Sequence, residues 1–319
     1  MKKLCTLLAL VLLLSCMPMS GCTAEPEPNP ATDFEYEIDE DGNATITRYT
    51  GQAVDVVIPA QIEGKNVTAI ATWAFYQRTT VKTVILPDTV ITLQSCAFQF
   101  CPALERIELS AQLQIIGAGA FSDCISLHTI ELPDTLTEIG NSAFEKCTSL
   151  KRIRIPGNVS VIGDLVFGES GLEVVELAEG IEYINTDLFH SCANLKKVVL
   201  PSSLREIRSG AFTNCGNLEK IALNEGLQII DRASFAYCSK LTEIVIPKTV
   251  TSISEYAFLN CENFKVMKFE GNAPAEFLCS DPVINQLWAK KNPEFTIYYH
   301  KNAQGFTSPE WNGYPTMIW

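Results

Sequence analysis

The chain has 319 residues, of which 47% are apolar, and its formal net charge is −13. This length and apolar content allow a folded body with a sizeable core. The acidic balance argues against nucleic acid as a partner and against a basic membrane-binding face.

Residues 1–22 have the pattern of an export signal, with two lysines at the start and an apolar stretch over Leu4–Leu14. This stretch is too short for a good transmembrane helix. Met19-Ser20-Gly21-Cys22 resembles a lipobox, the motif whose cysteine becomes the lipidated N-terminus of a bacterial lipoprotein. Leu13-Leu14-Ser15-Cys16 is a competing match. The small residues before Cys22 and the linker after it favour Cys22 as the lipidation site, and an ordinary cleaved signal is the alternative.

Residues 23–32 contain Glu25-Pro26-Glu27-Pro28-Asn29-Pro30, which predicts an extended, solvated tether. Residues 33–66 are predicted to form an N-terminal cap and a first divergent coil. Phe34–Tyr49 alternates apolar and polar residues around Asp41-Gly42-Asn43, a hairpin signal. About five extra residues, Ile62–Asn66, predict a small bulging loop in the first coil.

The central feature is a unit of 23 residues that recurs nine times, over residues 67–269. Its pattern is A-F-x-x-C-x-x-L-x-x-I-x-L-P-x-x-L-x-x-I-x-x-x. Every gap between its phenylalanines is 23 residues except one of 22, between Phe167 and Phe189. The phenylalanines are Phe75, Phe98, Phe121, Phe144, Phe167, Phe189, Phe212, Phe235 and Phe258. A fixed period of this length predicts a solenoid, in which each coil buries its apolar side chains against its neighbours.

The motif resembles the bacterial BspA-like form of the leucine-rich repeat, as in Leu127 to Cys147. The resemblance implies a β-rich leucine-rich-repeat solenoid with parallel strands on a concave face, irregular or short helical turns elsewhere, and caps at both ends. It also implies a surface-exposed bacterial protein that binds other macromolecules, and it implies no catalytic residues. Because Gly168-Glu169-Ser170-Gly171 lacks one residue and the cysteine, we expect a local kink there.

Seven of the twelve cysteines occupy one column of the repeat, three residues after the phenylalanine. They should therefore stack about 5 Å apart inside the solenoid, the spacing of neighbouring strands. Seven is an odd number, and Ser170 divides the column into three and four. We interpret these residues as buried free thiols that act as small hydrophobic side chains, with some vertical disulfides as the alternative. No histidine accompanies them, which argues against a metal site.

Residues 270–319 lose the period and are predicted to form a C-terminal cap with one short helix. Asp281-Pro282 is a helix start and Pro293 a stop. Phe295–Tyr299 is predicted to be a strand, and the segments around Gly305 and Trp311–Pro315 to be turn-rich. Two interpretations of the aromatic residues here stay open. They form a cap over the last coil, or Trp311, Tyr314 and Trp319 form a platform for sugar stacking.

Three positions in each coil, at seven, eight and ten residues after the phenylalanine, should point outward from the concave strands. Opposite charges in neighbouring coils can pair, so one interpretation of this face is a solvated ladder of ion pairs. The other is a ligand-binding surface with an apolar end at Val199, Ala222 and Val245. Sulfated or sialylated glycans and acidic protein loops would suit its basic part. The candidate residues are Glu131, Lys151, Arg152, Arg154, Glu176, Lys196, Lys197 and Lys220.

No motif for an active site or a cofactor occurs, and the three histidines are far apart in the sequence. We therefore expect a binding or adhesion module, not an enzyme, without cofactor or metal. It should be lipid-anchored to the bacterial membrane and should bind a host or neighbouring-cell protein or glycoprotein, with a glycan as a further possibility. The alternatives are an accessory protein that captures polysaccharide and a structural envelope scaffold without an external ligand.

Overall fold

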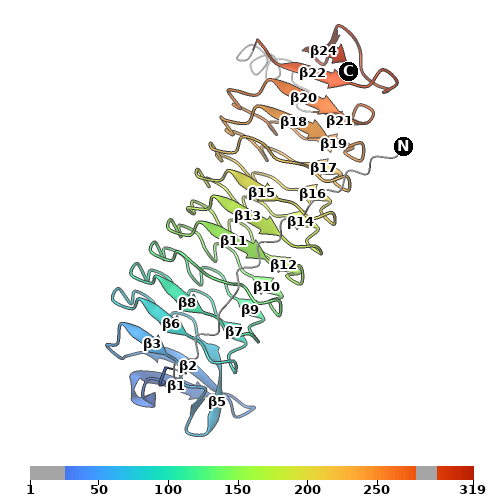
Figure 1. The fold of residues 1–319 in the computed structure, drawn as a ribbon. Coiled ribbons are helices and arrows are strands. Elements are labelled where there is room, and N and C mark those ends of the chain that lie inside the picture. The colour runs from blue at the N-terminus through green and yellow to red at the C-terminus, as the bar shows by residue number, and fades with distance from the viewer. Residues whose placement is uncertain (1–25, 278–292) are drawn as a thin grey trace, which may run out of the picture.

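The computed structural model describes residues 26–277 and 293–319. It is an elongated solenoid whose coils stack from the N-terminal to the C-terminal end (Figure 1). Each regular coil places one segment on a first face, a second segment on another face, and then a tight turn that contains the repeat phenylalanine. The predicted β-rich solenoid is therefore confirmed, and a 3-10 turn at Ala31–Asp33 is the single helical element among the described residues.

The first face is a ladder of parallel strands at the positions predicted from the Leu-x-x-Ile-x-Leu segment. Their residues alternate between the core and solvent. In Arg152–Ile155, the two arginines are exposed and the two isoleucines are buried. The strands are β3 (Asp55–Val57), β6 (Thr83–Ile85), β8 (Arg106–Glu108), β11 (Arg152–Ile155), β13 (Val174–Leu177), β15 (Lys197–Val199), β18 (Glu243–Ile246), β20 (Val266–Phe269), β22 (Thr296–Tyr299) and β24 (Tyr314–Ile318).

The second face is also a parallel ladder. The resemblance to leucine-rich repeats implied irregular or short helical turns there, and a two-residue strand is too short to show a period in the sequence. The strands are β2 (Ala44–Tyr49), β5 (Lys65–Ile70), β7 (Thr92–Leu93), β9 (Ile115–Ile116), β10 (Glu138–Ile139), β12 (Val161–Ile162), β14 (Tyr183–Ile184), β16 (Glu206–Ile207), β17 (Ile229–Ile230), β19 (Ser252–Ile253) and β21 (Glu276–Phe277).

Neither ladder is continuous. The first divides into three sheets, with breaks at the coils that contain Thr129–Leu132 and Ile221–Leu223. The second divides between β12 and β14, where the repeat is one residue short. A Cβ on Gly171 would lie 1.9 Å from the carbonyl oxygen of Thr148, so glycine is needed for the shortened turn. The first ladder pairs continuously past this point through β11, β13 and β15, so the expected kink is an interruption of the second ladder alone.

The repeat phenylalanines form one stack through the core. Successive ring centroids lie 4.7 to 5.6 Å apart, and the longest spacing joins Phe167 and Phe189 at the short coil. Tyr49 continues the stack at its N-terminal end and Phe264 packs against its C-terminal end. Because the stack passes through every ladder break, it holds coils together where strand pairing stops.

The turns around these phenylalanines have a third set of backbone hydrogen bonds. The amide of Phe121, for example, donates to the carbonyl oxygen of Ala143 in the next coil at 2.8 Å. In each regular turn, the residues two before and two after the phenylalanine have a positive φ. Only two of these positions carry glycine, Gly119 and Gly210. The turns are therefore regular in conformation without being glycine-rich in sequence.

The cysteine column is confirmed as a set of buried free thiols rather than disulfides. Each thiol donates to the carbonyl oxygen of the phenylalanine in the preceding coil, as Cys215 does to Phe189 at 3.2 Å. Ser170 takes the missing position and lies 3.3 Å from the Cys192 sulfur. The column is Cys101, Cys124, Cys147, Cys192, Cys215, Cys238 and Cys261.

The N-terminal cap contains the predicted hairpin, in which β1 (Phe34–Ile38) pairs antiparallel with β2. The β2 strand then pairs with β5, so the hairpin covers the open end of the second ladder. The extra residues predicted as a bulging loop form a second hairpin instead. In it, β4 (Gln61–Ile62) pairs with the start of β5 through a turn at Glu63 and Gly64, both with positive φ.

At the C-terminal end the first ladder continues beyond the predicted boundary, because β22 and β24 add to β20 in parallel. The predicted strand at Phe295–Tyr299 is thus confirmed, while the predicted helix lies outside the described residues. The segment predicted to be turn-rich contains a hairpin of β23 (Glu310–Trp311) with β24. Its turn residues, Asn312 and Gly313, both have positive φ, as a two-residue hairpin loop requires.

Candidate functional site

The outward side of the first ladder is a mixed-charge surface, as the repeat predicts. Opposite charges in neighbouring coils pair along it, with a nitrogen of Arg154 3.1 Å from a carboxylate oxygen of Asp134 and another 3.8 Å from Glu176. Further pairs are Lys82–Glu105 at 3.1 Å, Lys196–Glu173 at 2.9 Å, Lys220–Glu243 at 2.6 Å and Lys265–Glu294 at 2.6 Å. The interpretation as a ladder of solvated ion pairs therefore holds for many of these residues.

The hydrogen bonds in these pairs shift the ionisation of the acids. The Lys196 ammonium lowers the pKa of Glu173, and the Lys220 ammonium lowers the pKa of Glu243. The reciprocal effect of Glu243 raises the pKa of Lys220. These pairs therefore stay ionised at neutral pH and offer a ligand fixed charges, although their exposure limits what they add to stability.

A groove lies over the first break in this ladder. Its volume is about 460 Å³, and it runs from the segment Thr129–Leu132 across β11 to β13. A single bridge between Arg106 and Thr129 is the only strand-type pairing of the segment Thr129–Leu132 among the described residues. The groove is lined by Thr129, Ile130, Glu131, Leu132, Arg152, Ile153, Arg154, Val174 and Glu176.

Two neighbouring hollows extend this groove along the solenoid. One, of about 380 Å³, shares Thr129 and Glu131 with it and reaches Arg106 and Glu108. The other, of about 520 Å³, shares Arg154 and Glu176 and reaches Val199 and Pro201. We call the three together the first-ladder groove. Sequence analysis missed Arg106 and Glu108 as site residues, although both occupy the outward positions of their coil.

The first-ladder groove brings together four of the eight predicted site residues: Glu131, Arg152, Arg154 and Glu176. The other four lie outside its lining. Lys196 and Lys220 are held in ion pairs, and the Lys151 ammonium lies 3.4 Å from the carbonyl oxygen of Gly171. Lys197 is exposed at the edge strand β15.

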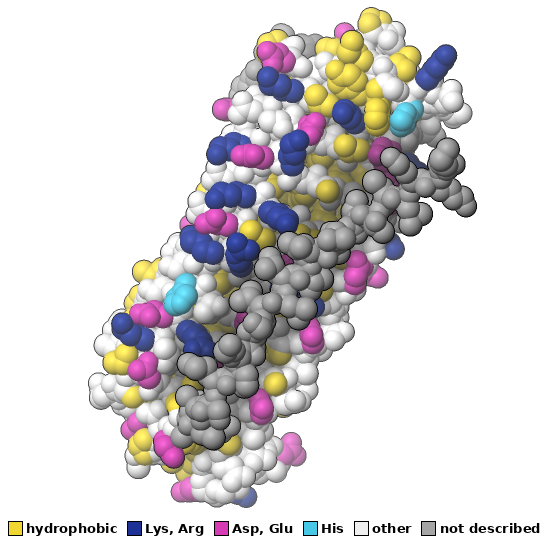
Figure 2. Space-filling model, viewed as in Figure 1, with side chains coloured by type: hydrophobic (Ala, Val, Ile, Leu, Met, Phe, Trp, Pro, Cys, Tyr) yellow, Lys and Arg dark blue, Asp and Glu magenta, His cyan; other side chains and the backbone are white. Residues whose placement is uncertain are grey.

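The middle of this face is locally basic although the chain is acidic. Over the four coils from Lys151 to Ala222, the outward positions carry six basic and three acidic side chains, a local net charge of +3. Dark blue side chains gather over these strands in Figure 2. Within residues 26–277 and 293–319, neither Arg152 nor Lys197 has an ion-pair partner. Their charges are available to an anionic group of a ligand.

Beyond the basic part, the column of Val199, Ala222 and Val245 continues into the cap. Strand register places Tyr298 beside Lys268 and Met317 beside Tyr298 in the same column. Sequence analysis missed this extension because the tail does not keep the 23-residue period. The exposed side chains of Val199, Val245 and Met317 make this end of the face more apolar than its middle.

Two of the three aromatic residues predicted as a sugar platform are buried. Trp311 and Tyr314 are 8% and 1% exposed, and both pack against Phe277. Trp319 is more exposed, but its ring stacks on His300 with centroids 4.5 Å apart, and the Lys268 ammonium lies over it. The cap interpretation is therefore confirmed for Trp311 and Tyr314.

The described residues contain no group of three His, Cys, Asp or Glu side chains placed to hold a metal ion. Among these residues there is also no helix long and apolar enough to cross a membrane. The predicted lipidation site, Cys22, and the competing Cys16 lie outside the described residues.

Comparison with known families decides the identity of the fold. Residues 55–173 and 162–274 match the family described as "BspA type Leucine rich repeat region (6 copies)". The chain belongs to the BspA-type leucine-rich-repeat family. Solenoids of this type are typically non-catalytic scaffolds for interactions with other macromolecules. A search of curated proteins finds no match.

Two solved structures agree with this assignment. A T. pallidum leucine-rich repeat protein is 35% identical, with 60% of this chain and 91% of that chain covered and a TM-score of 0.58. A leucine-rich repeat protein from Bacteroides ovatus is 26% identical, with 84% and 70% covered and a TM-score of 0.72. A third, described as a leucine rich cell surface protein from Faecalibacterium prausnitzii, is 23% identical, with 83% and 98% covered and a TM-score of 0.33.

Proposed function

We propose that this BspA-type protein is exported, lipid-anchored at Cys22 and exposed at the bacterial surface. There it captures a protein or glycoprotein of a host or neighbouring cell through the first-ladder groove. The lipobox-like motif and the charged, proline-rich linker in the sequence support the anchor and the exposure.

The observation that carries the proposal is the groove itself. It follows the outward strands over several coils, and it combines polar side chains such as Arg152 and Glu131 with apolar ones such as Ile130 and Val174. At about 4.8 Å per strand, the ladder is long enough for a standard protein interface. A mixed-charge groove with apolar contacts suits a polypeptide, which offers both kinds of group, better than a uniformly anionic chain.

Pull-down from mucus and cell-surface extracts tests the capture. The bait is the mature chain, compared with the triple variant Arg152→Glu, Arg154→Glu and Lys197→Glu. The proposal expects a specific protein that the wild type retains and the variant loses. A matched control, Lys65→Glu, Lys240→Glu and Lys301→Glu, makes the same charge change outside this face and should retain it. Equal capture by both variants would overturn the proposed site.

The anchor needs a separate test, since it lies in another part of the chain. Metabolic labelling with a fatty-acid analogue should mark the wild type and the Cys16→Ala variant but not Cys22→Ala. Labelling that depends on Cys16 instead would reassign the lipidated cysteine. Protease treatment of intact cells then measures surface exposure directly.

A further inference from the structure

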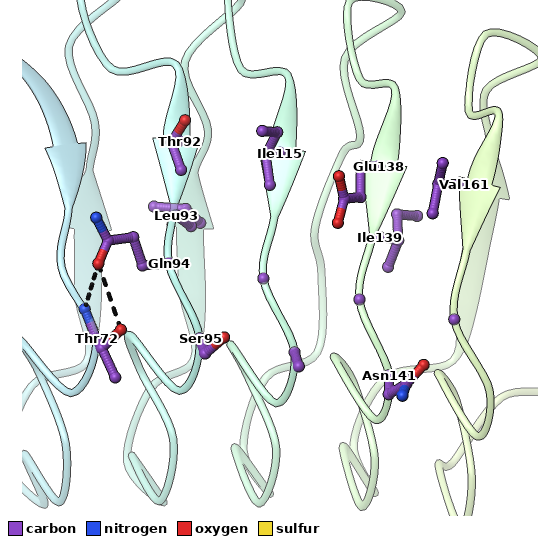
Figure 3. Close-up of a pocket in the computed structure, with 14 residues that line it drawn as sticks. Thr72, Thr92, Leu93, Gln94, Ser95, Ile115, Glu138, Ile139, Asn141 and Val161 are labelled. Atoms are coloured by element: carbon purple, nitrogen blue, oxygen red, sulfur yellow. Dashed lines mark hydrogen bonds between the residues drawn. The ribbon is translucent and has the colours of Figure 1, made fainter.

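A second groove lies on the other ladder, in its N-terminal half, and it differs in chemistry from the first-ladder groove. Its volume is about 530 Å³ and it spans five coils, from Thr72 to Gly163. We call it the second-ladder groove. Figure 3 shows Thr92, Ile115, Glu138 and Val161 in a row on successive strands, with Gln94, Ser95 and Asn141 along one side. Glu138 is the one charged residue in its lining.

Several polar groups in this groove have unused hydrogen-bonding capacity. The Gln94 side-chain oxygen accepts hydrogen bonds from the amide and the hydroxyl of Thr72, at 3.1 and 3.3 Å, which fixes its orientation (Figure 3). Its NH₂ group has no partner among the described residues. The same is true of the Thr92 and Ser95 hydroxyls and the Glu138 carboxylate. The groove thus presents both donors and acceptors at fixed positions.

The glycines on the floor are explained by coil packing alone. A Cβ on Gly117 would lie 2.6 Å from the backbone of Gln94, and one on Gly140 would lie 2.4 Å from the amide of Ala118. A ligand would therefore be bound by the polar groups above them. What the glycines add is a floor without side chains, open along the solenoid axis.

The same columns are filled in the first two coils beyond the groove. The Arg208 guanidinium lies over the Tyr183 ring, 4.4 Å from its centroid. It also donates to Asn185 at 3.1 Å and to Glu206 at 3.3 Å. Bulky side chains that contact and hydrogen-bond one another thus replace the glycines and unpaired polar groups. The second-ladder groove ends where this network begins.

The shape of the groove and its polar groups select a class of ligand. Uncharged polar side chains lie in three of its five coils, at Thr72, at Thr92, Gln94 and Ser95, and at Asn141, so an extended ligand with several hydroxyl groups can reach more than one of them. An open groove whose donors and acceptors are uncharged except for the Glu138 carboxylate suits hydroxyl groups better than phosphate or sulfate groups. From this geometry we propose that the second-ladder groove binds an extended, neutral polysaccharide chain. This site is independent of the first-ladder groove and of the protein ligand proposed for it.

Affinity electrophoresis of the mature chain tests the site, in gels that contain a β-glucan, an α-mannan, a xylan or, for comparison, heparin. At least one neutral polymer should retard the wild type. Ile115→Arg places a long charged side chain in the groove and should weaken retardation at least tenfold. The matched control is Ile229→Arg, because Ile229 occupies the same column of the ladder, three coils past the end of the groove. It should behave like the wild type.

Thermal unfolding of both arginine variants checks that each remains folded. The first-ladder triple variant should keep its neutral-polymer retardation, which separates this site from the proposed protein-binding function. The proposal is overturned if no neutral polymer retards the wild type. Retardation by heparin alone, or an equal loss in Ile229→Arg, would overturn it as well.

Discussion

The Cys215 thiol donates a hydrogen bond to the carbonyl oxygen of Phe189, 3.2 Å away and one coil earlier in the stack. That carbonyl also accepts the amide of Cys192 at 3.1 Å, so the thiol uses its second lone pair. The same contact recurs at every cysteine of the column, for example from Cys238 to Phe212. The column therefore links coils through the core at the residue that also carries the stacked ring.

Replacing Cys215 separates packing from hydrogen bonding. Cys215→Val keeps the apolar volume and removes the donor, so we expect a loss of about 0.5–1.5 kcal/mol in the free energy of unfolding. Cys215→Ala also opens a cavity and should cost more. Urea denaturation followed by circular dichroism measures both. A valine variant as stable as the wild type would show that the thiol acts only by its volume.

Stability should fall steeply at alkaline pH because of these thiols. Burial raises the pKa of the Cys192 thiol to about 12, and it also raises the pKa of Cys124, Cys147, Cys215 and Cys261. In the unfolded chain these groups ionise near their ordinary pKa. Below that pH, the neutral thiols make their full contribution to the free energy of unfolding. This contribution is lost as the pH rises toward the folded value.

At one pH unit above the ordinary thiol pKa, each such cysteine favours unfolding by roughly 1.4 kcal/mol. Urea midpoints measured between pH 8 and pH 10.5 should show this decline. Cys192→Ala should make the decline of the urea midpoint with pH smaller by the contribution of one thiol. A midpoint independent of pH in this range would contradict the assignment.

Because the turn residues have positive φ, replacing one of them by glycine should stabilise the protein. Ala233 has a φ of 53°, where an L-residue is strained, so Ala233→Gly should raise stability by up to about 1 kcal/mol. Gly210→Ala should lower it, because a Cβ there would lie 2.0 Å from an Asp187 carboxylate oxygen. Ala118→Gly, at an exposed position without positive φ, is the control and should cost about 0.5–1 kcal/mol. Thermal unfolding of the three variants gives the order.

The sequence predicted the parts of this fold that depend on side-chain type. Stacked phenylalanines, free thiols and outward strand positions all follow from one residue type recurring in one column, because each buried side chain must meet its equivalent in the next coil. The left-handed turn residues could not be predicted. The residues at these positions include Trp73, Leu165 and Tyr256, so backbone hydrogen bonds, rather than residue type, impose the conformation.

The candidate site was predictable only in part, for a similar reason. Which side chains point outward follows from the alternation in each strand, and Glu131, Arg152, Arg154 and Glu176 were found that way. The position of the hollow depends on breaks in strand pairing. The segment Thr129–Leu132 keeps the repeat motif although it forms no strand. The second-ladder groove depends on glycines and side-chain lengths across five coils, which a single repeat does not reveal.

The ladder break predicts uneven local stability. Amides in the segment 128–133 should exchange with deuterium faster than those in 173–178, the matching segment around β13, which pairs with a strand on both sides. Peptide-level mass spectrometry resolves the two segments. The phenylalanine stack passes through both coils, so global unfolding should not differ between them. Equal protection would mean that the break is closed in solution.

The exposed ion pairs of the first ladder should contribute little to stability and yet change the pKa of their carboxyl groups. Lys220 and Glu243 lie 2.6 Å apart and both are exposed, so solvent and salt screen their attraction. Lys220→Ala should therefore shift the urea midpoint less than Cys215→Ala does. It should nevertheless move the Glu243 titration, because the Lys220 hydrogen bond lowers the pKa of that carboxyl group. The folded pKa lies below the ordinary one, so any stabilisation is present at neutral pH and is lost as the pH falls through the lowered value.

Carboxyl-carbon NMR of Glu243 checks this directly. In Lys220→Ala its pKa should rise toward the ordinary value, whereas Lys240→Ala, which removes a lysine outside the pair, should leave it unchanged. Added salt should reduce the difference between wild type and variant. If Lys220→Ala destabilised the chain as strongly as Cys215→Ala, the pairs along this face would be structural. The charged residues on this face would then be explained by their contribution to stability and not by ligand binding.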